Sequence, residues 1–152
     1  MGLDKRYVTA IDLTARTSTG DPEGALVEQC EPPASDDLQE RLAALRGEVE
    51  LPIPAASAVK IGGERAYKLA RRGVAVEMPT RRSQISALDV ITYRDGEVCL
   101  DLRVSSGTYI RAIADAIGGH CRTLRRLEIG PFSVDEADPE RFIPPDEALA
   151  RL

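Results

Sequence analysis

Hydrophobic and polar residues alternate along several stretches of the chain, and this period of two is typical of a strand with one buried face. The alternation is clearest over residues 97–104 (EVCLDLRV). Residues 5–13, 25–30 and 82–93 predict further strands, because β-branched and other apolar residues are frequent there. Asp95-Gly96 separates two of these stretches and predicts a tight hairpin turn.

Apolar residues spaced three to four positions apart predict helices elsewhere. Residues 35–45 carry a leucine stripe that ends near Gly47, and residues 109–117 carry a second stripe that ends at Gly118. We expect shorter elements too: a helix at 64–72, helical turns at 138–142 and 144–149, an extended connector at 51–54 and an apolar strand within 122–132. The fold class predicted is mixed α+β, with a mainly antiparallel sheet and flanking helices.

Two segments outside this pattern are candidates for binding. Residues 14–24 form a polar loop that is longer than a simple hairpin needs. Residues 52–82 have Gly and Pro near both ends, with a short strand expected at 74–78, and their part from Lys60 to Arg82 holds seven basic residues against two acidic ones. We interpret 52–82 as a basic arm, although a solvated helix face explains the same charges about equally well.

Composition narrows the class of protein. The 152 residues are 43% hydrophobic and 30% charged, as in a globular domain with its own core, and no apolar run approaches the roughly 20 residues of a membrane span. The net charge of −5 argues against general nucleic-acid binding, but a local basic patch still neutralises phosphates. Cys30, Cys99 and Cys121 lack metal-ligand spacing, so we expect reduced thiols, no metal and a cytoplasmic location.

Residues 105–111 (SSGTYIR) join a predicted strand to a predicted helix. Gly107 permits the tight turn, and Ser106 or Thr108 is expected to cap the helix. Arg111 then falls in the first turn, where the helix dipole disfavours a cation, so a carboxylate or phosphate partner is expected. The alternative is an ordinary turn with a surface arginine.

The chain offers no phosphate-binding glycine loop, metal cluster or nucleophile elbow. It does place Tyr7, Tyr67 and Tyr109 near turns, together with several arginines. Tyrosine provides a flat face for a base, and arginine contacts phosphates or carboxylates, so these residue types favour RNA as a partner.

Four stretches, in the right order, resemble motifs of the TruB family of tRNA pseudouridine synthases. Residues 5–7 and the loop 17–24 (TSTGDPEG) are similar to the family's strand and T-x-T-x-D-x-x-G loop. Residues 57–73 are similar to its S-A-x-K-x-x-G…Y…A-R-x-G segment, 105–111 match S-x-G-T-Y-I-R, and 124–132 match L-R-R…G-x-F. Together the motifs cover most of residues 3–132.

The resemblance implies an isomerase that flips a uridine out of the tRNA T loop, breaks its glycosidic bond, turns the base and rejoins it through carbon. It implies one catalytic Asp, no cofactor, and the T-stem-loop of tRNA as partner. Carried over by motif, the resemblance implies that Tyr7 stacks on the flipped base, Tyr109 lines the pocket and Leu124 forms its apolar wall. It implies that Arg111 pairs with the catalytic Asp and that Asp21 is a supporting structural acid. In the arm, it implies RNA contacts at Lys60, Tyr67 and Arg71.

The chain departs from the family pattern at its start. The catalytic Asp of the family lies in a G-T-L-D-P-type motif upstream of the strand that carries Tyr7, and neither Asp12 nor Asp21 fits that motif. We therefore expect the later two thirds of a catalytic domain, without its N-terminal part and without a C-terminal RNA-binding domain. An exposed sheet edge near Tyr7 or Arg111, with self-association through it, is the expected consequence.

Two other functions stay open from the residues alone. A non-catalytic tRNA-binding or RNA-chaperone module would explain the basic arm without the catalytic Asp. The other is a structural protein with a coincidental basic arm.

Overall fold

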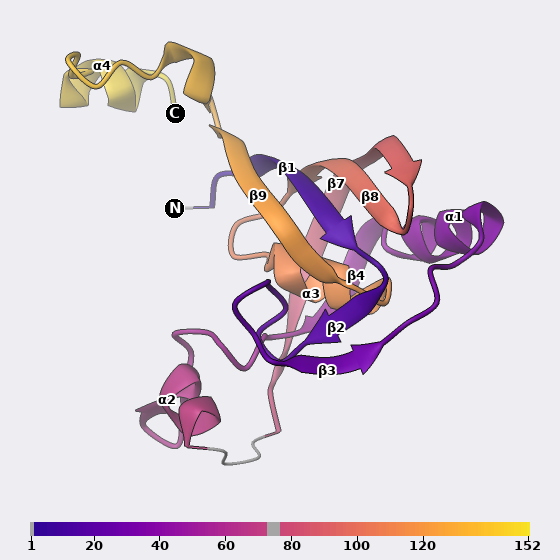
Figure 1. Ribbon diagram of the computed structural model, residues 1–152. Coiled ribbons are helices and arrows are strands. Elements are labelled where there is room, and N and C mark those ends of the chain that lie inside the picture. The colour runs from indigo at the N-terminus through magenta and orange to yellow at the C-terminus, as the bar shows by residue number, and fades with distance from the viewer. Residues whose placement is uncertain (1, 73–76) are drawn as a thin grey trace.

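The computed structural model describes residues 2–72 and 77–152, without the side chains of residues 70 and 71. Its centre is a six-stranded sheet in which all pairs of neighbouring strands are antiparallel (Figure 1). In spatial order the strands are β10 (Phe132–Ser133), β9 (His120–Ile129), β1 (Lys5–Asp12), β8 (Glu97–Val104), β7 (Thr80–Arg94) and β4 (Gly47–Pro52). The predicted α+β class with a mainly antiparallel sheet is confirmed.

β1 occupies a central position in this sheet. It pairs with β8 on one side and with β9 on the other, from Lys5 to Asp12 in both cases. The expectation of an exposed edge near Tyr7 is therefore wrong, because two strands from later in the chain enclose the first one. The edge near Arg111 is wrong as well, because Arg111 belongs to a helix. The outer strands are β4 on one side and the short β10 on the other, which pairs only with the last residues of β9.

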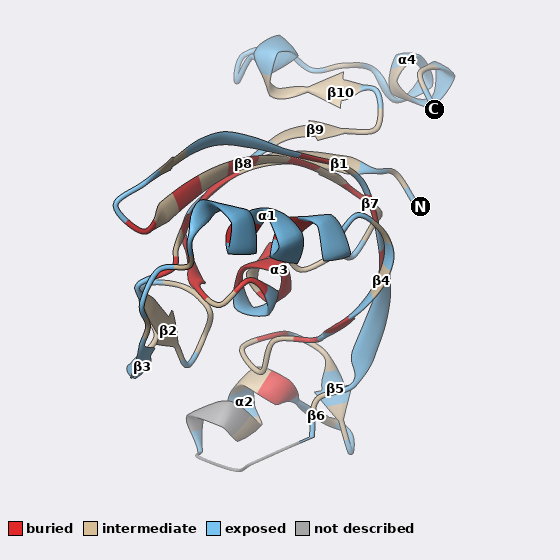
Figure 2. Cartoon of the chain, turned by 90° about the vertical axis from the view of Figure 1, so that its right-hand side faces the viewer, coloured by how far each residue is buried: buried red, intermediate tan, exposed pale blue. Residues whose placement is uncertain are grey.

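Two helices pack against one face of the sheet and form the core with it. The sheet curves around α1 (Ser35–Ala44) and α3 (Ile110–Ala116), as Figure 2 shows. The predicted leucine stripe of α1 is buried, and α3 buries most of its length. Arg111 lies in the first turn of α3 and is only partly buried.

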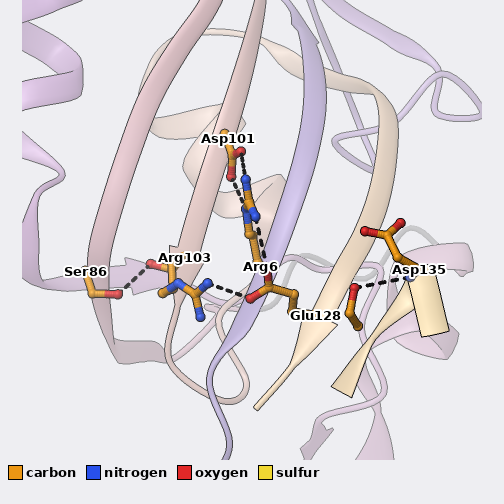
Figure 3. A network of polar contacts seen from close by, with 7 residues as sticks. Arg6, Ser86, Asp101, Arg103, Glu128 and Asp135 are labelled. Carbon is orange, nitrogen blue, oxygen red and sulfur yellow. Dashed lines mark hydrogen bonds and ion pairs between the residues drawn. The ribbon is translucent and has the colours of Figure 1, made fainter. Parts of the chain in front are cut away.

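Alternation along β8 separates the two faces of the sheet. Val98, Leu100, Leu102 and Val104 are fully buried on the helix-covered face. Arg6 of β1 lies on the opposite face, where it forms ion pairs with Asp101 of β8 and Glu128 of β9 at 2.7 and 3.0 Å (Figure 3). Because these three strands are neighbours, the network adds side-chain contacts to the backbone ladder on the solvent side.

The hairpin between β7 and β8 forms at the predicted place. Asp95 and Gly96 both have positive φ angles, 50° and 79°, as a two-residue turn of the type favoured in hairpins requires. This turn places Tyr93 opposite Val98. A register shift between Val90 and Thr92 then brings Leu88 opposite Leu102, so the match between the two strands depends on this irregularity in β7 as well as on the turn.

Several predicted element bounds differ from the structure. The loop 14–24 is shorter than expected, because β2 (Ala15–Thr17) occupies its start and pairs with β3 (Leu26–Gln29). Residues 51–52 of the predicted connector are the end of β4, and residues 53–54 follow it outside the strand. At the C-terminal end the chain forms a 3-10 turn, Val134–Glu136, and α4 (Pro145–Ala150), while the turn predicted at 138–142 is not helical.

Residues 53–79 leave the sheet and return to it. Pro52 of β4 faces Thr80 of β7, and the Ile53 N–H donates to the Pro79 carbonyl at 3.0 Å. These contacts hold the two ends of the segment side by side. Between these points lie the two-residue strands β5 (Lys60–Ile61) and β6 (Glu64–Arg65) and the helix α2 (Ala66–Arg71), which stand apart from the sheet in Figure 1. Most of the strand predicted at 74–78 lies outside the described residues.

Candidate functional site

Arg111, in the first turn of α3, connects three separate segments of the chain. Its Nη1 donates to the carboxylate of Asp21 at 2.9 Å and to the Thr19 carbonyl at 3.0 Å. Its Nη2 donates to the Ala56 carbonyl at 3.0 Å. One guanidinium group thus ties α3 to the loop that follows β2 and to the beginning of the arm, and all three contacts are compatible with its planar, fixed donors.

Asp21 is held in place and in its ionised form by its neighbours. The Thr19 hydroxyl donates to Asp21 Oδ1 at 2.6 Å, and the Glu23 N–H donates to the same oxygen at 3.2 Å. The Thr19 hydroxyl and the positive charge of Arg111 lower the pKa of Asp21 against the opposing effect of its partial burial. This carboxylate is the charged partner of Arg111 within the described residues.

A cavity of about 610 Å³ opens beside this ion pair. Arg111 and Asp21 form part of its wall, and Tyr67 of α2 lines it from the side of the arm. The remaining lining comes from the loop after β2 and the start of the arm, namely Ser18, Thr19, Glu23, Ala56, Ser57 and Ala58. The structure therefore brings Arg111, Asp21 and Tyr67 of the predicted site together around one space.

Tyr7 and Leu124 lie on neighbouring strands instead of on the wall of this cavity. Tyr7 faces Leu102 of β8, Leu124 faces Thr9, and directly opposed residues of antiparallel strands share a face, so both side chains lie on the helix-covered face. Tyr7 packs against the core, whereas Leu124 is 49% exposed. A half-exposed leucine on that face is available for contact with a flat apolar group.

Tyr109 directly precedes α3 and packs against the core with part of its surface buried. It occupies the N-cap position, and no side chain caps the helix there. The predicted cap by Ser106 or Thr108 is therefore wrong. Ser106 accepts a hydrogen bond from Lys5 of β1 at 2.8 Å, and the Thr108 hydroxyl lies 3.3 Å from the Ser105 hydroxyl within the turn, so both side chains have other partners.

The predicted RNA contacts of the arm lie on different parts of it. Lys60 is exposed on β5 and lines a second hollow of about 510 Å³ together with residues 77–80. Arg71 ends α2, and its side chain lies outside the described residues. Lys60 therefore does not share the cavity of Arg111.

Asp12 and His120 make local hydrogen bonds to the chain around β2. Asp12 accepts from the Thr14 hydroxyl and backbone N–H at 2.6 and 2.8 Å, and His120 Nδ1 lies 2.9 Å from the Ala15 carbonyl. Burial raises the pKa of the Cys121 thiol. Within residues 2–72 and 77–152, no group of His, Cys, Asp and Glu is arranged to hold a metal ion. None of the helices described there is long and apolar enough to cross a membrane.

Two residues of the site were not singled out from the sequence. Thr19 orients Asp21, and Ser57 lines the cavity between Arg111 and Tyr67. Both lie inside the stretches 17–24 and 57–73, so the motifs pointed to their neighbourhood. Their individual roles depend on contacts between segments that are far apart in the chain.

Comparison with known proteins defines the class to which this fold and site belong. The model of the TruB family pseudouridylate synthase N-terminal domain matches residues 1–110. The chain therefore belongs to the TruB family of pseudouridine synthases. It is 45% identical over 150 residues to the tRNA pseudouridine synthase B of Mycobacterium sp. (strain KMS), covering 90% of this chain and 50% of that relative.

A second relative agrees with this family, and one solved structure shares the fold. The tRNA pseudouridine synthase B of Leifsonia xyli subsp. xyli (strain CTCB07) is 38% identical over 164 residues, covering 98% of this chain and 54% of the relative. A chain in the crystal structure of a Cbf5-Nop10-Gar1 complex shares the fold, with a TM-score of 0.60 and 23% identity over 88% of this chain and 32% of that one. This chain spans about half the length of the curated relatives it matches.

Proposed function

We propose that this chain supplies the tRNA-binding part, and one side of the uridine pocket, of a pseudouridine synthase that acts on the T loop of tRNA. The observation that carries the proposal is the Arg111–Asp21 pair, at 2.9 Å, in the wall of a cavity that the arm also lines. In a member of the TruB family, this geometry suits RNA held between the arm and the loop after β2, with the flipped base reaching Tyr7 and Leu124 on the sheet outside this cavity.

The proposed reaction moves the bond from ribose C1′ to uracil N1 onto uracil C5. The uracil then bears a proton on N1 and has lost the one on C5, so no atom of the nucleotide is gained or lost and no cofactor is needed. Arg111 would hold the catalytic Asp of the G-T-L-D-P-type motif ionised while Asp21 balances its charge from the other side. Tyr7 would stack on the base, with Tyr109 lining the pocket.

Two further residues complete the proposed pocket and its RNA contacts. Leu124 would form the apolar wall, since its side chain is 49% exposed on the same face as Tyr7. Lys60, exposed on the arm, would contact a backbone phosphate together with Arg71. The proposed partner is accordingly the T-stem-loop of tRNA, and the proposed location is the cytoplasm.

The exposed outer strands suggest how isolated copies of this chain behave. β4 forms one margin of the sheet, and most of β9 has no partner on its outer side within the described residues. Unpaired strand edges are templates for pairing with another strand. We therefore propose concentration-dependent self-association of the isolated chain, which sedimentation velocity at rising concentration detects and a constant monomer mass contradicts.

Complementation tests the proposed reaction. The chain is mixed with a separately produced segment of the mycobacterial relative that carries the G-T-L-D-P-type motif, and uridine conversion is measured in a T-stem-loop and in an anticodon stem-loop. Conversion in the T loop alone supports the proposal. A stable complex of the two pieces that binds the T-stem-loop and converts nothing contradicts it.

A non-catalytic RNA-binding module is the second candidate, because the Asp21 carboxylate is already engaged by Thr19 and Arg111. It predicts T-stem-loop binding that weakens steeply with salt and no isomerisation with any added segment.

A further inference from the structure

Two arginines on the outer face of the sheet, the face away from the helices, are neutralised by carboxylates. Arg6 of β1 is paired there with two acidic side chains, as Figure 3 shows. Arg82, near the start of β7, lies 3.2 Å from Glu50 and 3.8 Å from Glu48 of β4. Both arginines are therefore engaged within the chain.

Their neighbours in the sequence, Lys5 and Arg81, lie on the helix-covered face, because successive residues of a strand point to opposite faces. The register agrees with this placement. Lys5 is directly opposite the fully buried Val104, and Arg81 is opposite Leu51, which is only 7% exposed. No carboxylate pairs with either cation within the part of the chain that the structure describes. Two positive charges thus lack a counter-charge on this face.

The two cations meet at one turn, the turn that leads into α3. Lys5 Nζ donates to Ser106 Oγ at 2.8 Å and to the Leu3 carbonyl at 2.6 Å, so one of its three donors has no partner among the described residues. The Arg81 guanidinium group lies directly over Gly107, since a Cβ at that glycine would be 2.6 Å from Arg81 Cζ. Its donors likewise have no partner within residues 2–72 and 77–152. Unused donors and positive charge therefore converge on two adjacent residues.

This turn lies beside the residues proposed to bind the flipped base. Lys5 precedes Tyr7 by two positions on the same face of β1, and Gly107 precedes Tyr109 by two positions. Arg81 is exposed and directly follows the end of the arm. A phosphate is negatively charged and accepts hydrogen bonds from both ammonium and guanidinium groups, so it matches this pair of cations.

We propose that Lys5 and Arg81 bind a backbone phosphate next to the flipped uridine, across the turn that precedes α3. This inference rests on the proposed function and names the group that holds the RNA backbone there. Base flipping turns a nucleotide about its backbone, so a phosphate held at this turn fixes the point from which the base enters. The cavity beside Arg111 is a poorer phosphate site, because two carboxylates line it and its cation is already paired.

Arg81→Gln tests the proposal, and Arg82→Gln is the matched control one residue away. Arg81→Gln should lower the affinity for the T-stem-loop about tenfold, the effect of one charged hydrogen bond, and reduce the slope of log affinity against log salt by about 1. Its melting temperature should equal that of the wild type, because the guanidinium group has no polar partner among the described residues of the free chain. Arg82→Gln removes the same charge and should change the affinity less than about twofold. Lys5→Gln should weaken binding as Arg81→Gln does, measured below its own melting transition because the ammonium group also holds Ser106.

A T-stem-loop with an uncharged methylphosphonate in place of one phosphate identifies the contacted group. Each of the two phosphates that flank the target uridine is replaced in turn, and on one of these RNAs wild type and Arg81→Gln should bind equally. A tenfold difference that persists on both RNAs overturns the proposal, as does an equal loss of affinity in Arg82→Gln or a lowered melting temperature of Arg81→Gln. Equal binding of unmodified RNA by wild type and Arg81→Gln overturns the role of this turn alone. A wild type that binds no T-stem-loop overturns the proposed function and this inference with it.

Discussion

Arg111 and Asp21 are 90 positions apart in the chain, and their side chains form an ion pair of 2.9 Å. The pair is only partly exposed, with 25% of the Arg111 side chain and 31% of the Asp21 side chain accessible. It neutralises a cation in the first turn of α3, where the helix dipole is unfavourable to positive charge. The same guanidinium group also anchors the arm through Ala56, so the position of the arm depends on this pair.

Replacing Arg111 by lysine should destabilise the fold although the charge is kept. An ammonium group cannot reach the Thr19 carbonyl, the Asp21 carboxylate and the Ala56 carbonyl together, because it lacks the planar fork of donors. We expect Arg111→Lys to lower the free energy of unfolding by about 1–3 kcal/mol in urea titrations. Arg122→Lys, at a side chain that is 61% exposed and pairs with Glu97, should change it by less than about 0.5 kcal/mol. Equal losses in both variants would refute the anchoring role.

The Asp21 carboxylate should make stability depend on acid pH. Thr19 and Arg111 lower its pKa in the folded chain below the value of about 3.9 that an unfolded Asp has. The unfolded chain therefore binds more protons, and the stabilisation is present above that value and lost as the pH falls through the folded pKa. The free energy of unfolding of Asp21→Asn should therefore fall less steeply than that of the wild type as the pH is lowered from about 5 to about 2. Glu40→Gln, on the exposed side of α1, is the matched carboxyl-to-amide control, and a slope common to Asp21→Asn and wild type would argue against the assignment.

Alanine substitutions of Leu124 and Leu100 should distinguish a loss of RNA binding from a loss of stability. Leu124→Ala should lower the free energy of unfolding by less than about 1 kcal/mol, because the side chain is 49% exposed, and should weaken T-stem-loop binding severalfold. Leu100 is fully buried, so Leu100→Ala should cost about 2–5 kcal/mol. Chemical denaturation and fluorescence anisotropy measure the two effects. A Leu124→Ala variant with unchanged RNA affinity would remove Leu124 from the pocket.

Lys60 should contribute to RNA binding through a phosphate. Each phosphate contact releases counterions, so Lys60→Ala should reduce the slope of log affinity against log salt by about 1 and weaken all sequences alike. Arg94→Ala is the control, since Arg94 is exposed at the end of β7 that lies farthest from the arm. An identical salt slope for Lys60→Ala and wild type would contradict a phosphate contact.

The strands with strict alternation could be predicted from the sequence. β8 and the hairpin at Asp95-Gly96 carry strong local signals, because one buried face and two positive φ angles each require particular residues. β4 was missed, since its residues GEVELP contain Gly, Glu and Pro, which are rare in strands; its place at the sheet margin tolerates them. The order of the strands could not be predicted, because β1 acquires its neighbours from residues about 90 to 120 positions later.

Some features of the candidate site could likewise be predicted from the sequence, and others could not. The need of Arg111 for an anionic partner followed from its position in a first helical turn, and the T-x-T-x-D-x-x-G loop drew attention to Asp21. That these two residues meet, and that Thr19 orients the carboxylate, is a result of long-range packing. A buried hydroxyl such as that of Ser57, which has no partner among the described residues, has no signature in a sequence at all, since it depends on the burial of one atom. The pairing of Arg111 with a catalytic Asp stays a prediction.

The most direct test of the central claim is pseudouridine formation at a single T-loop uridine, read by carbodiimide-blocked reverse transcription. An unmodified tRNA T-stem-loop is incubated with the chain alone, and with the chain plus the segment that carries the G-T-L-D-P-type motif. We expect no stop with the chain alone, a stop at the target uridine with both pieces, and none when Arg111→Lys replaces the wild type. A stop with the chain alone, or an undiminished stop with Arg111→Lys, would contradict the central claim.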